Sequence, residues 1–136
     1  VERFLSEILE LPWEKVYEEA TKWENILSPV TEKAMLSLLG NPTTGLFGNP
    51  IPYSEYKKEK TFNLLNAEKD RNYSINKITE ELKRDASMIS FLQENKIVPG
   101  SNISIADANE FSITVSTENK KFFGLDQYIA ERVFVN

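Results

Sequence analysis

The side chains that could carry chemistry in this chain are its carboxylates. Its 136 residues include 21 Asp and Glu but neither His nor Cys. Because iron(II), nickel, cobalt and zinc prefer imidazole and thiolate ligands, a metal site built only from oxygen would suit magnesium, manganese or calcium. Carboxylate pairs can also act as general acid and base, but Glu18-Glu19 and Glu80-Glu81 are neighbours that point to different sides of a helix or strand. We therefore predict no enzyme.

Charge and composition narrow the class of protein further. The net charge of −5 is opposite in sign to the surface expected of a nucleic-acid-binding domain. The absence of Cys excludes disulfides and fits a reducing compartment. No apolar run approaches the roughly 18 residues of a membrane span, and Glu2 and Arg3 do not begin a signal peptide. We therefore expect a cytoplasmic protein without membrane contact.

A loop with a specified shape is expected at residues 41–52, which read N-P-T-T-G-L-F-G-N-P-I-P. Each Pro fixes its own φ and biases the residue before it toward extended backbone. Gly45 and Gly48 permit positive φ or a close approach of another backbone. Such a segment is neither a helix nor an ordinary strand.

Three short helices are expected before this loop. The first carries apolar residues at helical spacing and stops before Pro12, which suits the first turn of the second. The third begins at Ser28-Pro29, a cap followed by a first-turn Pro, and ends at Gly40. The second has an apolar stripe typical of core packing: Trp13, Val16, Ala20, Trp23 and Leu27. Three short helices do not close a core alone, so they imply a partner surface. The first helix offers these apolar residues for it: Phe4, Leu5, Ile8 and Leu9.

The remaining sequence has the short β-prone runs that are typical of a small β domain. Residues 54–72 carry charges of both signs around Phe62 and Leu65 and indicate a charged linker with an apolar middle that can dock on a neighbouring domain. Asp85 can cap a helix that ends near Glu94, and β-prone runs follow at residues 103–106, 111–116, 121–123 and 132–135. We predict an α+β fold: a helical domain at residues 1–53, followed by a small SH3-like β-barrel at residues 73–136.

Two segments of the chain resemble the diphtheria toxin repressor family of iron- and manganese-dependent transcriptional regulators. The shared motifs are Leu-Pro-Trp at residues 11–13, E-A-T-K-W-E at residues 19–24 and the loop at residues 41–52. The resemblance covers about residues 2–52 and 78–135, and in the second stretch it extends to small SH3-like proteins linked to ferrous iron transport. It implies the C-terminal two-thirds of such a regulator, without the N-terminal winged-helix domain that binds operator DNA. It also implies that residues 1–53 are a dimerisation and metal-binding domain and that the helices form the interface of a homodimer, with Phe4, Leu5, Ile8 and Leu9 as its residues on the first helix.

The resemblance also implies metal ligands, of which only some are retained. Four family ligand positions on the second helix fall at Tyr17, Thr21, Glu24 and Asn25, where only Glu24 is an intact ligand. Glu2 matches a carboxylate of an ancillary site, while Glu80 and Lys83 match a Glu and a Gln supplied by the SH3-like domain. The candidate ligands of iron(II) or manganese(II) are therefore Glu2, Thr21, Glu24, Asn25 and Glu80. Alternatively, these sites have become salt-bridge clusters in which the ammonium of Lys83 takes the place of a cation.

Two functions from different classes follow. The leading hypothesis is the dimerisation and metal-sensing portion of a metal-dependent transcriptional regulator, in which metal bridges this part to the winged helix and spaces two DNA readers for a palindromic operator. The alternative is a dimeric interaction module whose SH3-like barrel binds a peptide, for instance one containing Pro, and whose metal sites have decayed.

Overall fold

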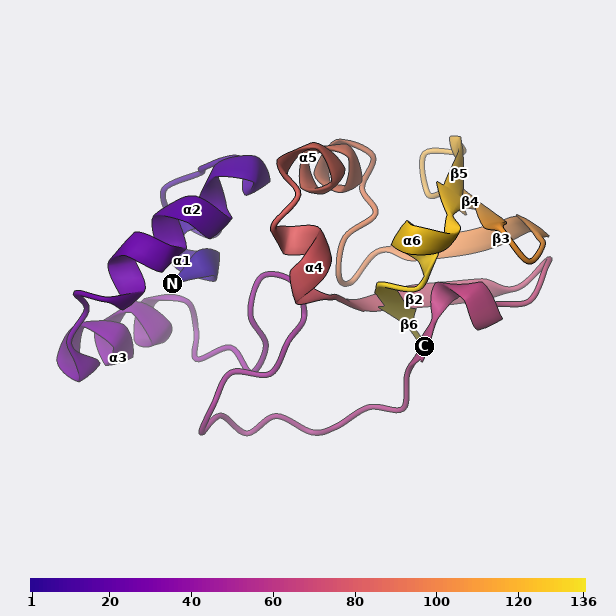
Figure 1. The fold of residues 1–136 in the computed structure, drawn as a ribbon. Coiled ribbons are helices and arrows are strands. Elements are labelled where there is room, and N and C mark those ends of the chain that lie inside the picture. The colour runs from indigo at the N-terminus through magenta and orange to yellow at the C-terminus, as the bar shows by residue number, and fades with distance from the viewer.

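The computed structural model describes residues 1–136 and has two parts, three helices at one end and an antiparallel sheet at the other (Figure 1). The helices are α1 (Glu2–Glu7), α2 (Trp13–Glu24) and α3 (Pro29–Leu38). Pro12 stands at the N-cap of α2 in extended backbone, and the Ser28 hydroxyl accepts the amide hydrogen of Thr31 at the start of α3. The three expected helices therefore form and begin where the sequence places their starts, but α1 and α2 end before the predicted helix residues Ile8, Leu9 and Leu27.

Only a small apolar cluster belongs to the helices alone. It consists of Leu5, Val16 and Ala20. Trp13, at the start of the same buried face of α2, instead joins the main core and packs edge-on against Phe47, with 4.7 Å between the ring centroids. Since three side chains bury little apolar area, the helical part depends on the rest of the chain for its stability.

The second part is a six-stranded antiparallel sheet with the strand order β1-β6-β2-β3-β4-β5. Its strands are β1 (Phe62–Asn63), β2 (Asn72–Ile78), β3 (Asn102–Ala108), β4 (Ser112–Thr117), β5 (Phe122–Asp126) and β6 (Val133–Val135). The first half of β2 pairs with β3 and its second half with β6, so this one strand joins the two halves of the sheet. The α+β fold class, with helices followed by a small β domain, is confirmed.

Short helices cover the sheet and connect its strands. These are η1 (Leu64–Asn66), α4 (Glu80–Lys83), α5 (Ala86–Glu94) and α6 (Gln127–Ala130). The Asp85 carboxylate accepts the amide hydrogen of Met88, so the predicted cap of α5 is present. Figure 1 shows α4 and α5 between the N-terminal helices and the sheet, where α5 lies against α2. The amide of Trp13 donates to the side chain of Gln93 across this contact, at 3.0 Å.

Three details of the β domain differ from the expectations. Phe111 lies before β4 and its side chain is 72% exposed, whereas Ile113 and Val115 are buried. Strand β2 carries no alternating apolar pattern and was not predicted. Strand β1 and η1 lie inside the segment expected to be a linker, and Leu64 is completely buried in the main core. The apolar middle of this segment therefore docks on the β domain, as the sequence indicated, but it does so as a strand and a short helix of that domain.

The loop at residues 41–52 joins the two parts. It is closed by backbone hydrogen bonds from Gly45 to Asn49 and from Ile51 to Thr43. The carbonyl of its Phe47 accepts the amide hydrogen of Ile78 at 2.8 Å, and the Phe47 ring is 1% exposed. Gly48 has φ +89° and passes directly over Asn76 and Lys77 of β2. The loop is therefore packed into the junction, as its Pro and Gly content indicated.

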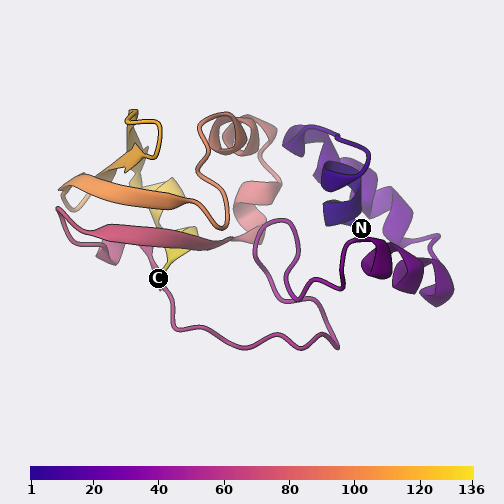
Figure 2. The same ribbon diagram turned by 180° about the vertical axis from the view of Figure 1, so that it is seen from behind.

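Past this loop the chain runs along the outside of the molecule as an extended segment before it reaches β1 (Figures 1 and 2). The segment is attached through Glu59, whose carboxylate accepts hydrogen bonds from the side chains of Asn76 and Asn136. These bonds hold it near β2 and β6.

Candidate functional site

The largest collection of carboxylates around one cavity lies at the junction of the two parts. The cavity has a volume of about 540 Å³ and is lined by α1, α3, the end of α2, the loop at residues 41–52 and α4. Its acidic residues come from four separate helices: Glu2, Glu24, Glu32 and Glu80. The structure thus brings three of the five predicted metal ligands to one place. Glu32 was not predicted, because it belongs to no motif.

A lysine ammonium bonds to two of these four carboxylates. The Nζ of Lys83 donates to Oε1 of Glu80 at 2.8 Å and to Oε1 of Glu2 at 3.0 Å. It also lies 5.2 Å from the centre of the Phe47 ring, within the range of a cation–π contact. The Lys83 side chain is 7% exposed, compared with 56% for Glu80. Two carboxylates and an aromatic face therefore surround the charge.

The electrostatic balance at this group favours the charged lysine. Burial disfavours the ammonium, but the hydrogen bond to Glu80 and the charge and hydrogen bond of Glu2 outweigh it and raise the pKa of Lys83 above its ordinary value. The second oxygen of Glu2, Oε2, is buried without a hydrogen-bond partner. One unpaired carboxylate oxygen thus remains beside the ammonium, on the α1 side.

Two of the predicted ligands lie elsewhere. Thr21 and Asn25 are on the exposed face at the end of α2, outside the cavity lining. The Thr21 hydroxyl donates to the carbonyl of Tyr17 at 2.9 Å, and the Asn25 side chain donates to the carbonyl of Thr21 at 3.2 Å. Both side chains bond to the backbone of their own helix. They do not converge with Glu24 on a common point.

The residues predicted at the dimer interface fall into two groups. Leu5 is 1% exposed and belongs to the small helical cluster, so its own chain already covers it. Phe4 is half-buried and its ring lies 6.1 Å from that of Trp23. Ile8 and Leu9 are exposed. The spacing of apolar residues does not distinguish those that pack inside their own chain from those that are free to contact a partner.

A larger exposed apolar surface lies on α3 and the turn before it. Ile26, Val30 and Leu38 are all exposed, Val30 to 80%, and no side chain of α3 is buried. Val30, Ala34 and Leu38 recur at four-residue spacing and therefore share one face of the helix. Five of the nine large exposed apolar side chains lie within the first 38 residues. Such a concentration is typical of an interaction surface.

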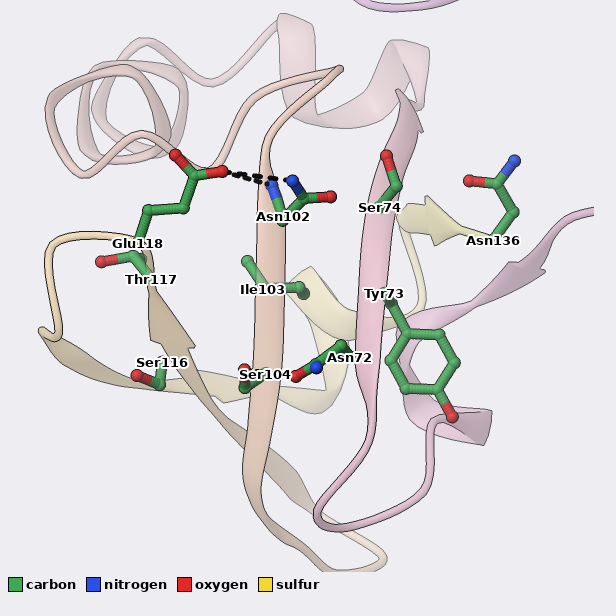
Figure 3. Close-up of a pocket in the computed structure, with 10 residues that line it drawn as sticks. All are labelled: Asn72, Tyr73, Ser74, Asn102, Ile103, Ser104, Ser116, Thr117, Glu118 and Asn136. Atoms are coloured by element: carbon green, nitrogen blue, oxygen red, sulfur yellow. Dashed lines mark hydrogen bonds between the residues drawn. The ribbon is translucent and has the colours of Figure 1, made fainter.

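A second groove runs across the sheet between β2, β3 and β4 (Figure 3). Its lining is almost entirely polar, with Tyr73 as its single aromatic residue. Glu118 reaches over its rim to the backbone and side-chain amides of Asn102, both at 3.3 Å. Grooves that bind Pro-rich peptides are lined by aromatic side chains. This groove therefore lacks the chemistry of such a site.

Comparison with protein families identifies the helical part. Residues 1–53 match the sequence model of the family described as "Iron dependent repressor, metal binding and dimerisation domain". The helical part belongs to this family. The matched segment contains α1, α2, α3 and the loop at residues 41–52.

Individual repressors match the chain over different lengths. The iron-dependent repressor IdeR of Mycobacterium tuberculosis is 30% identical over 125 residues, which cover 84% of this chain and 54% of the repressor. The diphtheria toxin repressor of Corynebacterium jeikeium is 43% identical over 51 residues, or 38% of this chain and 21% of that protein. The chain spans about half the length of the IdeR relatives that it matches. The resemblance to iron-dependent repressors is thus confirmed.

Solved structures show the same fold. A "Manganese-dependent transcriptional repressor complex with manganese" superposes with a TM-score of 0.86 at 21% identity, over 99% of this chain and 65% of that one. The IdeR of T. acidophilum gives a TM-score of 0.82 at 23% identity, over 99% of this chain and 62% of its own. At this level of identity the likeness establishes the arrangement of helices and sheet.

The metal expected for an iron dependent repressor domain does not fit the residues of this chain by themselves. No three His, Cys, Asp or Glu residues are grouped so that they could hold an ion. Of the retained carboxylates, Glu2 and Glu80 are bonded to Lys83, and the predicted ligands Thr21 and Asn25 donate hydrogen bonds to the backbone of their own helix. A complete iron or manganese site on this surface would need further ligands from outside residues 1–136.

No helix of the structure has the length and apolar character needed to cross a membrane.

Proposed function

We propose that this chain is the dimerisation and metal-sensing portion of a metal-dependent transcriptional regulator that binds operator DNA as a homodimer. The family match of residues 1–53 supports the class of protein. The net charge of −5 supports a division of labour in which another domain contacts DNA. Dimerisation is the part of this function that the residues of the chain carry themselves.

The observation that carries the proposal is the exposed apolar face of α3. Val30, Ala34 and Leu38 form its stripe, and Ile26 extends it toward α2. A helix with no buried residue in its own chain gains little from folding unless a partner covers it. A second copy of the same face can cover it symmetrically, because a two-fold interface pairs identical patches.

The dimer has a direct consequence for DNA recognition. Two DNA-reading domains attached to a rigid dimer are held at a fixed separation, which matches the spacing of half-sites in a palindromic operator. Because Phe47 fixes the helical part to the sheet, the dimer interface and the β domain form one rigid support.

The test is the mass in solution of the wild-type chain and of the double variant Val30→Glu/Leu38→Glu. We expect light scattering to give about twice 15.6 kDa for the wild type and 15.6 kDa for the variant. Both side chains are exposed within one chain, so the circular dichroism spectrum should keep its wild-type shape. The melting temperature should fall, because the variant loses the stabilisation that dimerisation gives the wild type.

A matched control is Phe111→Glu/Phe122→Glu, which changes two exposed apolar side chains on the β domain and should leave the dimer intact. A monomeric wild type at about 100 μM, far above the Kd of a stable dimer, would contradict the proposal. A dimeric Val30→Glu/Leu38→Glu variant would place the interface elsewhere.

A further inference from the structure

We propose that the ammonium of Lys83 is a built-in cation that joins the helical part to the β domain without metal. This inference concerns the junction inside one chain and does not depend on dimerisation. It explains why carboxylates from α1 and α4 converge at a place where no group of metal ligands exists.

Lys83 links segments that are distant in the sequence through its ion pairs with Glu2 and Glu80, which we call the Lys83 clasp. Glu2 lies on α1 and Lys83 on α4, 81 residues apart, and their bond of 3.0 Å links the two parts directly. Glu80, one turn before Lys83 on the same short helix, supplies the second carboxylate at 2.8 Å. The Phe47 ring lies against the same ammonium. Three different segments thus meet at one charge.

Charge arithmetic favours the lysine over a divalent ion in this position. Glu2 and Glu80 contribute −2 and Lys83 contributes +1, which leaves −1 at the group. A manganese ion added beside Lys83 would bring the group to +1 and would face a fixed positive charge at close range. If Lys83 were neutral, the same ion would bring the group to zero. The lysine therefore fills the electrostatic role of the ion and excludes it.

The other lysine with two carboxylate partners shows what distinguishes Lys83. Lys22 lies 3.1 Å from Glu19 and 3.9 Å from Glu18, all within α2. Its side chain is 61% exposed and connects no distant segments. It has the charges of the Lys83 group without the burial or the bridge between segments. Lys22→Gln is therefore the matched control for Lys83→Gln.

A tethered ammonium cannot be removed by a chelator, nor does its occupancy follow the concentration of free metal. The junction is therefore closed at every metal concentration. Any metal response of the full-length protein would arise at other ligands, and the helical part and the β domain would move as one body during it.

The test measures the melting temperature of the full chain with and without manganese(II), after treatment with a chelator. We expect the wild type to melt at the same temperature with either EDTA or manganese(II). Lys83→Gln should melt about 5–10 °C lower, since it leaves two carboxylates without their cation. Manganese(II) at about a hundred times its Kd should then raise the melting temperature of Lys83→Gln by about 5 °C.

Two variants identify where any ion binds. The gain in Lys83→Gln should vanish in Lys83→Gln/Glu80→Gln, because the second carboxylate is lost, and Lys22→Gln should behave as the wild type. The proposal is overturned if manganese(II) stabilises the wild type and Glu80→Gln abolishes this effect. It is equally overturned if Lys83→Gln has the same melting temperature as the wild type and manganese(II) does not raise it. Should Lys83→Gln fail to fold, calorimetric titration of the wild type and of Glu80→Gln with manganese(II) decides between the same alternatives.

Discussion

Replacing Gly48 by Ala should separate the helical part from the β domain. A Cβ at this position would overlap the carbonyl oxygen of Asn76 and lie 2.8 Å from the Cα of Lys77, and both are backbone atoms of a paired strand. Neither can move as a flexible side chain would. The loop itself would have to shift away from β2, which breaks the hydrogen bond from the Ile78 amide to Phe47.

Gly100 provides a control that isolates the steric part of this effect. Its φ is +91°, nearly the same as the +89° of Gly48, but a Cβ built there meets no atom within 4 Å. Both substitutions carry the strain of a left-handed Ala, about 1–2 kcal/mol. Both also gain the same reduction in unfolded-state entropy. The difference between them is the close approach of β2.

The free energy of unfolding should fall by about 3–6 kcal/mol for Gly48→Ala, the sum of strain, overpacking of about 1–3 kcal/mol and a lost backbone hydrogen bond of about 1 kcal/mol. Gly100→Ala should lose only about 1–2 kcal/mol. Urea denaturation followed by circular dichroism measures both values. Equal destabilisation of the two variants would refute the claim that the loop is pressed against β2.

The remaining predictions concern the core, pH and helix capping. Phe47→Ala should lower the free energy of unfolding by about 3–5 kcal/mol, whereas Tyr53→Ala, at a fully exposed side chain, should change it by less than about 0.5 kcal/mol in the same urea titration. The pKa of Lys83 is raised in the folded state, so its clasp stabilises the fold below the ordinary lysine pKa of 10.5 and loses this effect as the pH rises through the raised value. The stability difference between the wild type and Lys83→Met should therefore be constant from about pH 7 to 9 and shrink above about pH 10.5, and a difference that grows with pH would contradict the sign. Asp85→Ala removes the acceptor of the Met88 amide and should cost about 1 kcal/mol, visible as a lower melting temperature.

The starts of the helices could be predicted because a single residue determines each of them. Ser28 and Asp85 each accept an amide hydrogen of the first turn, and Pro12 marks the start of α2. Strand β2 could not be found in the same way. Its buried residues Ile75 and Ile78 are three positions apart, because the pairing of β2 with β6 shifts register between Ile75 and Lys77, just after the strand changes partner from β3 to β6. An irregularity of that kind removes the alternation by which strands are recognised.

Motif matching could predict which carboxylates lie at the junction, but not that Lys83 would be buried among them. Glu2, Glu24 and Glu80 were named from the sequence, and the structure places all three around one cavity. The sequence could not show that Lys83 would be buried there against Phe47, because that contact depends on how the loop folds over β2. It also could not assign Leu5 to the interior, since Leu5, which is buried, and Ile8 and Leu9, which are exposed, belong to one apolar pattern in the sequence.

The position of β6 in the sheet has a consequence for folding during synthesis. It lies between β1 and β2, yet it is translated after all the other strands. Until Val133–Val135 leave the ribosome, β1 has no partner and the second half of β2 is an open edge. Open edges can pair with other chains. The nascent chain therefore keeps these strand edges unpaired until β6, the last strand of the sheet, emerges.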